Sequence, residues 1–426
     1  MKRKVLMVEL FTLYALRITH YASRITHHAS RFTLTLWLAG LVTTIVACRP
    51  TGPTPVRFTV PTAIRHTPTS VALTPAVQAS PTGPLLSPEV PALPPTELAP
   101  TMPELTSVGL VTQAGWNALS LVPGGRILAP TAGHDSILWV ASAGSGLGLY
   151  VHNLRTDKTR SLAGPSTPGG CVCRGYRRGD WIVMVEAEPG ATWWEVSALN
   201  LATDLHVAVG RTDDPATLSA LRPSEIAVNA EGQIVWKDVA TSAGGSVVET
   251  LRLHNARTGE VSDIISVRSP VGIGQMTMYG DWVVWSQATE GEAGTRGDVF
   301  AYNVRSDALF PIGETGRAWE PAIWGTTVVW KHADGPFADG DVFLFDLETG
   351  EGRLLTAGGE VSQVGVGDGF VVWSSASAGV VVRRDLQADT DEVIGRGAVG
   401  RLAAGANTVV WLLDDDPGTL YIAWKR

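Results

Sequence analysis

The hydrophobic and polar positions between residues 130 and 411 repeat as a unit. In each unit a turn with Gly, Asp or Asn precedes two or three aliphatic residues and then one large residue, as in Gly325-Thr-Thr-Val-Val-Trp330. Seven such runs occur, and their large anchor residues are Trp139, Met184, Trp236, Trp285, Trp330, Trp373 and Trp411. Spacings of about 40–50 residues are the period of a four-stranded propeller blade.

A second apolar strand follows each anchor and ends in a polar turn. Val342-Phe-Leu-Phe-Asp-Leu-Glu-Thr-Gly350 is the most complete example. Segments 149–157 and 299–307 match it well, and segments 251–259 and 381–389 match it less well. The Asn or Asp side chain can accept a hydrogen bond from the backbone two residues on, and the closing Gly or Asp tolerates a positive φ. The pattern therefore predicts a hairpin between the third and fourth strands of each blade.

The anchor strand reads as a continuous apolar run, which is typical of a strand covered on both faces. A Trp buries about 150–250 Å² and can fill the wedge between two radially packed sheets. We therefore predict an all-β domain over residues 106–426, a seven-bladed β-propeller, with six or eight blades as alternatives. The last unit has only three strands, so we expect residues 106–112 to complete it and to close the ring.

The first 105 residues have a different character. Basic residues open the chain, an apolar run extends from Leu34 to Ala47, and Cys48 follows it. Ile45-Val46-Ala47-Cys48 resembles the lipobox of bacterial lipoproteins, so we predict a signal segment over residues 1–48 and lipidation of Cys48. An uncleaved anchor or an ordinary signal peptide is the alternative. Residues 50–103 hold fourteen of the 26 prolines, so residues 49–105 are predicted to be a disordered linker.

Charge excludes one class of partner. Residues 1–105 hold nine of the 33 Lys and Arg and four of the 41 Asp and Glu. Residues 106–426 therefore carry 24 basic and 37 acidic side chains, a formal net charge of −13. Such a field repels phosphate backbones, so we expect no nucleic acid partner. We expect a monomer, held at the extracytoplasmic face of a cell membrane or at the cell surface by the lipid on Cys48.

The two half-motifs together resemble the TolB-like β-propeller repeats of exported and surface proteins. Segment 325–350 matches best, and the second unit, with Met184, departs most. The resemblance covers about three quarters of the chain, and its motifs specify a fold without catalytic residues. It implies an extracytoplasmic binding or scaffold module for a protein, peptide or glycan ligand.

No catalytic constellation is found in the sequence. A channel enzyme, such as a hydrolase or lyase acting on glycans, is the alternative function. It needs carboxylates or histidines on the innermost strands, and these strands read as largely apolar, for example Pro321-Ala-Ile323 and Val364-Gly-Val366. The binding function is therefore favoured, and no cofactor is expected.

Two smaller groups of residues remain open. Cys171 and Cys173 are interpreted as thiols without a partner, because a bridge so close in sequence would be strained. A redox-active pair and a contribution to a metal site are the alternatives. Asp334, Asp339 and Asp341 could supply oxygens to calcium, but solvated hairpin turns have the same composition.

Overall fold

The computed structural model describes residues 56–57, 117–121, 126–143, 146–188, 194–212, 225–242, 244–291 and 294–425. Within these ranges the regular secondary structure consists of β-strands alone. The predicted signal segment lies outside the described residues. So does the predicted linker, apart from β1 (Val56–Arg57), which pairs with β22.

The other described strands pair antiparallel in groups of four, here called units and numbered in chain order. The first unit is β3 (Leu128–Ala132), β4 (Ser136–Ala143), β5 (Gly146–Asn153) and β6 (Lys158–Ala163). The second is β7 (Cys171–Arg178), β8 (Trp181–Ala187), β9 (Trp194–Asn200) and β10 (Leu205–Thr212). The third is β11 (Ile226–Val228), β12 (Gln233–Thr241), β13 (Val247–Asn255) and β14 (Val261–Arg268). One parallel pair, Leu147 with Cys171, joins the first two units.

The remaining units repeat this arrangement. The fourth is β15 (Val271–Tyr279), β16 (Trp282–Gly291), β17 (Gly294–Asn303) and β18 (Ala308–Gly313). The fifth is β19 (Ala318–Trp324), β20 (Thr327–His332), β21 (Asp341–Asp346) and β22 (Glu351–Leu354). The sixth is β23 (Val361–Gly367), β24 (Phe370–Ser375), β25 (Val380–Asp385) and β26 (Thr390–Arg396).

An N-terminal strand completes the last unit. β27 (Val399–Ala404), β28 (Thr408–Leu413) and β29 (Leu420–Trp424) are joined by β2 (Asn117–Leu121), which pairs with β29 from Asn117↔Trp424 to Leu121↔Leu420. The sequence predicted this role for residues 106–112, which lie outside the described residues. The strand that completes the last unit is thus a later segment than the one predicted.

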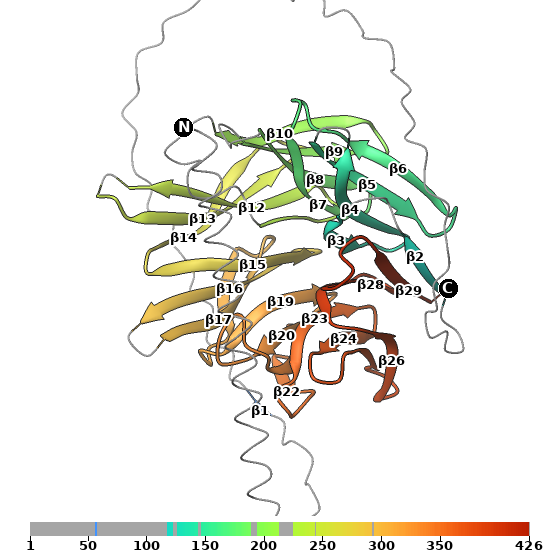
Figure 1. The fold of residues 1–426 in the computed structure, drawn as a ribbon. Helices are drawn as coiled ribbons and strands as arrows, with labels where there is room; N and C mark the ends of the chain where they lie inside the picture. Colours follow the sequence, from blue (N-terminus) through green and yellow to red (C-terminus); the bar gives the residue numbers. More distant parts are fainter. Residues whose placement is uncertain are drawn as a thin grey trace, which may run out of the picture. The chain divides into compact units, whose positions relative to one another are not determined.

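Seven clusters of buried hydrophobic residues lie between successive units of the described chain. One of them packs Trp139 of the first unit against Val410 and Ile422 of the last, so the stack closes on itself. Figure 1 shows the same closure, with β28 and β29 beside β2 and β3. The all-β propeller architecture predicted from the repeat is confirmed.

The anchor residues lie in these clusters. All seven are buried, with exposed fractions from 0% for Trp285 to 8% for Met184. Trp330, for example, packs with Val284 and Val299 of the preceding unit and stacks on Phe343 of its own, with 4.6 Å between ring centroids. Glycine makes room for some of them. A Cβ on Gly395, in the outer strand β26, would lie 2.6 Å from Trp411 Cζ2.

The predicted turns between third and fourth strands are confirmed. The side-chain oxygen of Asn303 accepts hydrogen bonds from the backbone N–H groups of Arg305 (3.2 Å) and Ser306 (3.0 Å). The same pair of bonds is made by Asn153, Asn200, Asn255, Asp346 and Asp385. The turn at Asn200 was not among the predicted ones. A positive φ closes the turn, as at Asp307 (56°) and Gly350 (70°).

Candidate functional site

A cavity of about 540 Å³ opens where the first turns of five units meet. In each unit this turn joins the innermost strand to the second strand. The lining residues are Gly133, His134, Asp135, Ser136, Asn153, Arg155, Arg177, Arg178, Gly179, Asp180, Ala230, Glu231, Tyr279, Gly280 and Trp324. Equivalent turns of five consecutive units can share one cavity only around the axis of the ring. We call it the axial cavity.

The guanidinium of Arg178 packs against two aromatic rings inside this cavity. Its guanidinium carbon is 4.6 Å from the centroid of the Trp324 ring and 5.0 Å from that of Tyr279. Its Nη2 donates to the Tyr176 hydroxyl at 3.2 Å. Arg178, Tyr279 and Trp324 each precede the glycine of a first turn, so the repeat places them at equivalent positions in three units. Stacking on aromatic rings fixes the plane of the guanidinium.

Arg177 is held by neutral oxygens. Its Nε donates to the Gly179 carbonyl at 2.9 Å, and its Nη1 donates to Ser136 Oγ at 3.0 Å. Burial lowers the pKa of Arg177, and the charge of Asp180 opposes that shift. The cavity therefore contains two half-buried cations whose hydrogen bonds go to hydroxyl and carbonyl groups.

The acidic side chains of the cavity are arranged differently. Asp135 accepts from Arg155 at 2.7 Å and lies 3.0 Å from His134 Nδ1, and these neighbours hold the pKa of Asp135 below its usual value despite its burial. Asp180 and Glu231 are exposed. Water screens exposed charges, so they compensate the half-buried arginines only weakly.

A second group of charges lies on or beside the innermost strands, with Lys331 on the second strand of its unit. Arg174 Nη1 is 3.2 Å from Glu225 Oε1, and Lys331 Nζ is 3.2 Å from Glu320 Oε1. Burial raises the pKa of both Glu225 and Glu320, and the charge of Arg401, from the last unit, opposes that rise in each. Because Arg401 belongs to the seventh unit and acts on carboxyl groups of the third and fifth units, which do not adjoin it in the ring, these side chains converge at the axis. We call this group the axial belt.

Burial dominates both carboxyl groups of the belt. It raises the pKa of Glu225, against the opposing charges of Arg174 and Lys237. It also raises the pKa of Glu320, against the charge and hydrogen bond of Lys331. Lys331 is 2% exposed and donates to Pro336 O (3.0 Å) and Ser362 O (3.5 Å) as well. The belt thus links the second unit to the third through the Arg174–Glu225 pair, and the fifth to the sixth through the hydrogen bond from Lys331 to Ser362 O.

The axial belt corrects one sequence interpretation. The innermost strands were read as largely apolar, but the pairing register shifts in most of them, between Trp319 and Ala322 in β19 and between Val399 and Arg401 in β27. A β-bulge of this kind re-aims side chains. Glu320, with a φ of 55°, lies inside one such bulge. The charges therefore come from positions just before the apolar stretches that the sequence analysis considered.

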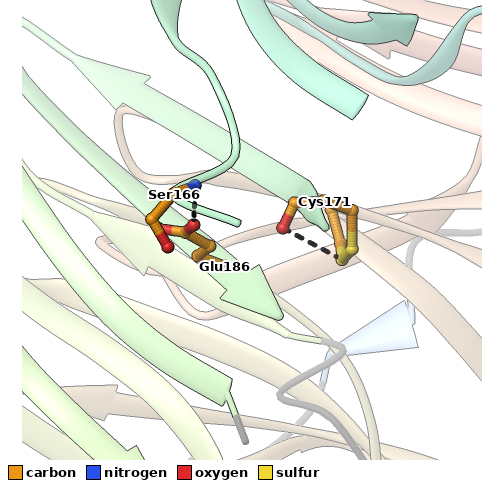
Figure 2. Close-up of a disulfide and its surroundings, with 4 residues drawn as sticks. Ser166, Cys171 and Glu186 are labelled. Carbon is orange, nitrogen blue, oxygen red and sulfur yellow. Dashed lines mark hydrogen bonds between the residues drawn. A yellow bond between two sulfur atoms is a disulfide. The ribbon is translucent and has the colours of Figure 1, made fainter. Parts of the chain in front are cut away.

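A disulfide joins Cys171 and Cys173, which were interpreted as unpaired thiols. Figure 2 shows this bridge near Glu186, which accepts a hydrogen bond from the Ser166 backbone. The register of β7 against β8 shifts between Val172 and Arg174, so Cys173 is the extra residue of a bulge. The two Cα atoms are 4.9 Å apart, within the range that disulfides span. The interpretation assumed a regular strand and was wrong.

The candidate calcium residues are not brought together. Asp334 pairs with Arg317 at 2.9 Å. Asp341 Oδ1 accepts from Thr356 Oγ1 and from the backbone of Gly358 and Gly359. Asp339 lies in the same loop, between β20 and β21. Across the described ranges there is no cluster of three or more His, Cys, Asp or Glu side chains suited to a metal ion.

The predicted lipidation site, Cys48, lies outside the described residues. Among the residues that the structure does describe, no helix has the length and hydrophobicity needed to cross a bilayer.

Comparisons with known proteins add information about the fold. No protein-family model matches the chain, and no curated protein matches it by sequence. Among solved structures, the β-propeller domain of the trilobed protease from Pyrococcus furiosus is similar, with 11% identity and a TM-score of 0.50 over 70% of this chain and 95% of that one. An oligogalacturonate lyase in complex with manganese has 13% identity and a TM-score of 0.51 over 75% of this chain and 96% of that one.

Larger peptidases are also similar. An acylaminoacyl peptidase from Pyrococcus horikoshii has 11% identity and a TM-score of 0.51, over 71% of this chain and 52% of that one. This chain therefore spans about half the length of that peptidase. Identities this low carry information about architecture and none about chemistry. The pairing of the strands and these likenesses together show that the described domain is a β-propeller.

Proposed function

We propose that this protein is a membrane-tethered, extracytoplasmic binding module whose propeller takes a protein, peptide or glycan ligand at the axial cavity. The cavity is the observation that carries the proposal. Its volume of about 540 Å³ lies within the range of ligand sites, and its wall combines aromatic rings with a few fixed polar groups. The resemblance to TolB-like repeats and the lipobox at Cys48 support the tethered, exported setting.

Binding is favoured over chemistry in the channel because of how the axial belt is paired. A general acid or base must be free to exchange a proton with a substrate. Glu225 is held by Arg174, and Glu320 is held by Lys331. Both carboxylates are thereby engaged in ion pairs, between the second and third units for Glu225 and within the fifth unit for Glu320. The negative charge of the domain supports the absence of a nucleic acid partner, and we propose that the protein acts as a monomer.

The binding proposal is tested by filling the cavity. Ala230 is exposed in its wall, so Ala230→Trp should obstruct it. We expect a screen of the full-length protein against peptide and glycan arrays to yield ligands whose binding falls at least tenfold in this variant. The matched control is Ala388→Trp, at an exposed turn outside the cavity lining, which should bind like the wild type. Ligands that bind Ala230→Trp and wild type equally well would place the binding surface elsewhere.

The tether is tested at Cys48. If this residue carries the lipid, Cys48→Ser should move the protein from the membrane fraction to the soluble fraction, since the acyl chains supply the membrane affinity. Fractionation followed by immunoblotting measures the change, and mass spectrometry of the N-terminal peptide identifies the lipid. An unchanged membrane fraction would contradict lipidation and favour an uncleaved anchor.

A further inference from the structure

Two cations of the axial cavity have no carboxylate partner. Within the described residues no Asp or Glu oxygen lies within 4.0 Å of the side-chain nitrogens of Arg177 or Arg178, whereas Arg155 at the edge of the same cavity pairs with Asp135 at 2.7 Å. Burying a charge without a counter-charge is costly. The cavity therefore holds two guanidinium groups that the fold leaves without a direct ion pair, although its lining contains as many carboxylates as arginines.

The two guanidinium groups are also oriented for binding. The stack on Tyr279 and Trp324 occupies a face of Arg178, so only the edge of its guanidinium is left for hydrogen bonding. The Nε atom is buried out of reach of the cavity and has no hydrogen-bond partner among the described residues, so a ligand would meet this guanidinium at its Nη groups. Arg177, adjacent in sequence, is fixed by Gly179 and Ser136. A guanidinium presents its N–H groups as a planar fork, which matches a carboxylate in two parallel hydrogen bonds.

We infer that Arg177 and Arg178 form a carboxylate-binding site, and that the part of the ligand seated in the axial cavity is a compact group bearing one carboxylate. This inference rests on the proposed binding function and names the ligand class. The aromatic rings of Tyr279 and Trp324 supply apolar contact beside the fork. The cavity volume suits a compact ligand of this kind.

The negative charge of the domain and the carboxylates of the cavity wall favour a single carboxylate over a phosphate or a polyanion. The domain carries a formal net charge of −13, which repels a long polyanion before it reaches the cavity. Asp135 and Asp180 also act on Arg177. Their repulsion is weaker for a carboxylate with a single charge than for a phosphate with two. A monocarboxylate therefore gains most from the two arginines at the smallest electrostatic cost.

The experiment is a titration of the full-length protein in detergent by calorimetry, with acetate, succinate and hippurate as the carboxylate probes. Inorganic phosphate and poly-glutamate form the competing arms. We expect the binding of hippurate, which carries an aromatic ring as well as a carboxylate, to saturate at one site per chain. Its affinity should fall as the salt concentration rises. Tighter binding of phosphate or poly-glutamate than of every small carboxylate would overturn the inference.

Variants locate the site. Arg177→Gln and Arg178→Gln should each weaken the binding of hippurate at least tenfold, because a charge-assisted hydrogen bond is lost. Arg178→Lys keeps the charge but loses the fork and should weaken it as well. The matched control is Arg305→Gln, an arginine that is 80% exposed and pairs with Asp281 outside the cavity lining. Its affinity should stay within twofold of the wild type.

A measurement on the unaltered protein covers the case in which a variant fails to fold. Phenylglyoxal modifies guanidinium groups, and mass spectrometry reports which ones. Hippurate should slow the modification of Arg177 and Arg178 and leave Arg305 unaffected. Equal modification with and without hippurate, or unchanged affinity in both Gln variants, would contradict the carboxylate site. If the ligands found on the arrays still bind more weakly to Ala230→Trp than to the wild type in that case, the binding function stands and only the ligand class is wrong.

Discussion

Replacing Trp330 with alanine is expected to lower the free energy of unfolding by about 3–5 kcal/mol. The indole is 1% exposed and lies between the fourth and fifth units, against Val284, Val299 and Phe343. Two sheets that form a rigid ring cannot collapse fully around the space that the indole leaves. The loss therefore includes a cavity contribution in addition to the lost transfer energy. Chemical denaturation followed by circular dichroism measures the change.

Two further variants make this prediction specific. Trp330→Phe keeps a ring on Phe343 and removes an indole N–H that is buried without a hydrogen-bond partner among the described residues. It should cost clearly less than the alanine variant. Phe337→Ala removes an aromatic side chain that is 89% exposed, and it should change the free energy of unfolding by no more than about 0.5 kcal/mol. A wild-type denaturation midpoint for Trp330→Ala would contradict the role of the anchors.

Replacing Lys331 with methionine is expected to cost about 2–3 kcal/mol at pH 8, because it leaves the half-buried Glu320 carboxylate, whose side chain is 26% exposed, without its cation. Glu320 then has only the more distant Arg401 as an opposing charge. Burial already raises the pKa of Glu320 above its ordinary value of 4.5, and Lys331 restrains that rise. Without Lys331 the pKa of Glu320 in the folded state is higher still.

The sign of the pH dependence follows from that shift. The folded state holds a proton on Glu320 at pH values where the unfolded chain has lost it, so stability falls as the pH rises. The penalty in Lys331→Met should be full above the folded-state pKa and should disappear as the pH falls below about 4.5, the ordinary value of the carboxyl group. Denaturation midpoints between pH 4 and pH 8, compared with those of the wild type, measure it.

The double variant Lys331→Met with Glu320→Gln is the control. It removes both charges, so it should recover more than half of the stability lost at pH 8. A loss that is the same at every pH and is not recovered by Glu320→Gln would mean that Lys331 acts through packing of its aliphatic stem alone.

The repeat made the propeller predictable. Runs such as Thr327 to Trp330 recur with the hairpin signal of Asp346 to Gly350, and each half reports a local requirement: a strand buried on both faces, and a turn closed by a positive φ. Requirements of this kind restrict a few consecutive residues, so they can be recognised in a short stretch of sequence. The closing strand was less predictable, because segments 106–112 and 117–121 are both short and partly apolar.

The site was harder to predict because it is assembled across units. Arg178, Tyr279 and Trp324 are 146 residues apart from first to last, and what they share is their place before a turn glycine. That shared place is a signal that the sequence analysis could have used. The belt residue Glu320 and the bridged Cys173 were hidden for another reason. Each lies in a β-bulge, where the alternation of inward and outward side chains fails.

The strand that closes the ring also decides where the chain enters it. β2 is antiparallel to β29, and Asn117 lies opposite Trp424, at the end of the last unit that holds the turn between β27 and β28. Equivalent turns of five other units build the axial cavity, so β2 begins on the face of the propeller where that cavity opens, at the outer edge of the last unit. If Cys48 carries a lipid as proposed, the tether would join the propeller on its cavity face, so the membrane and the ligand would compete for the same side of the domain.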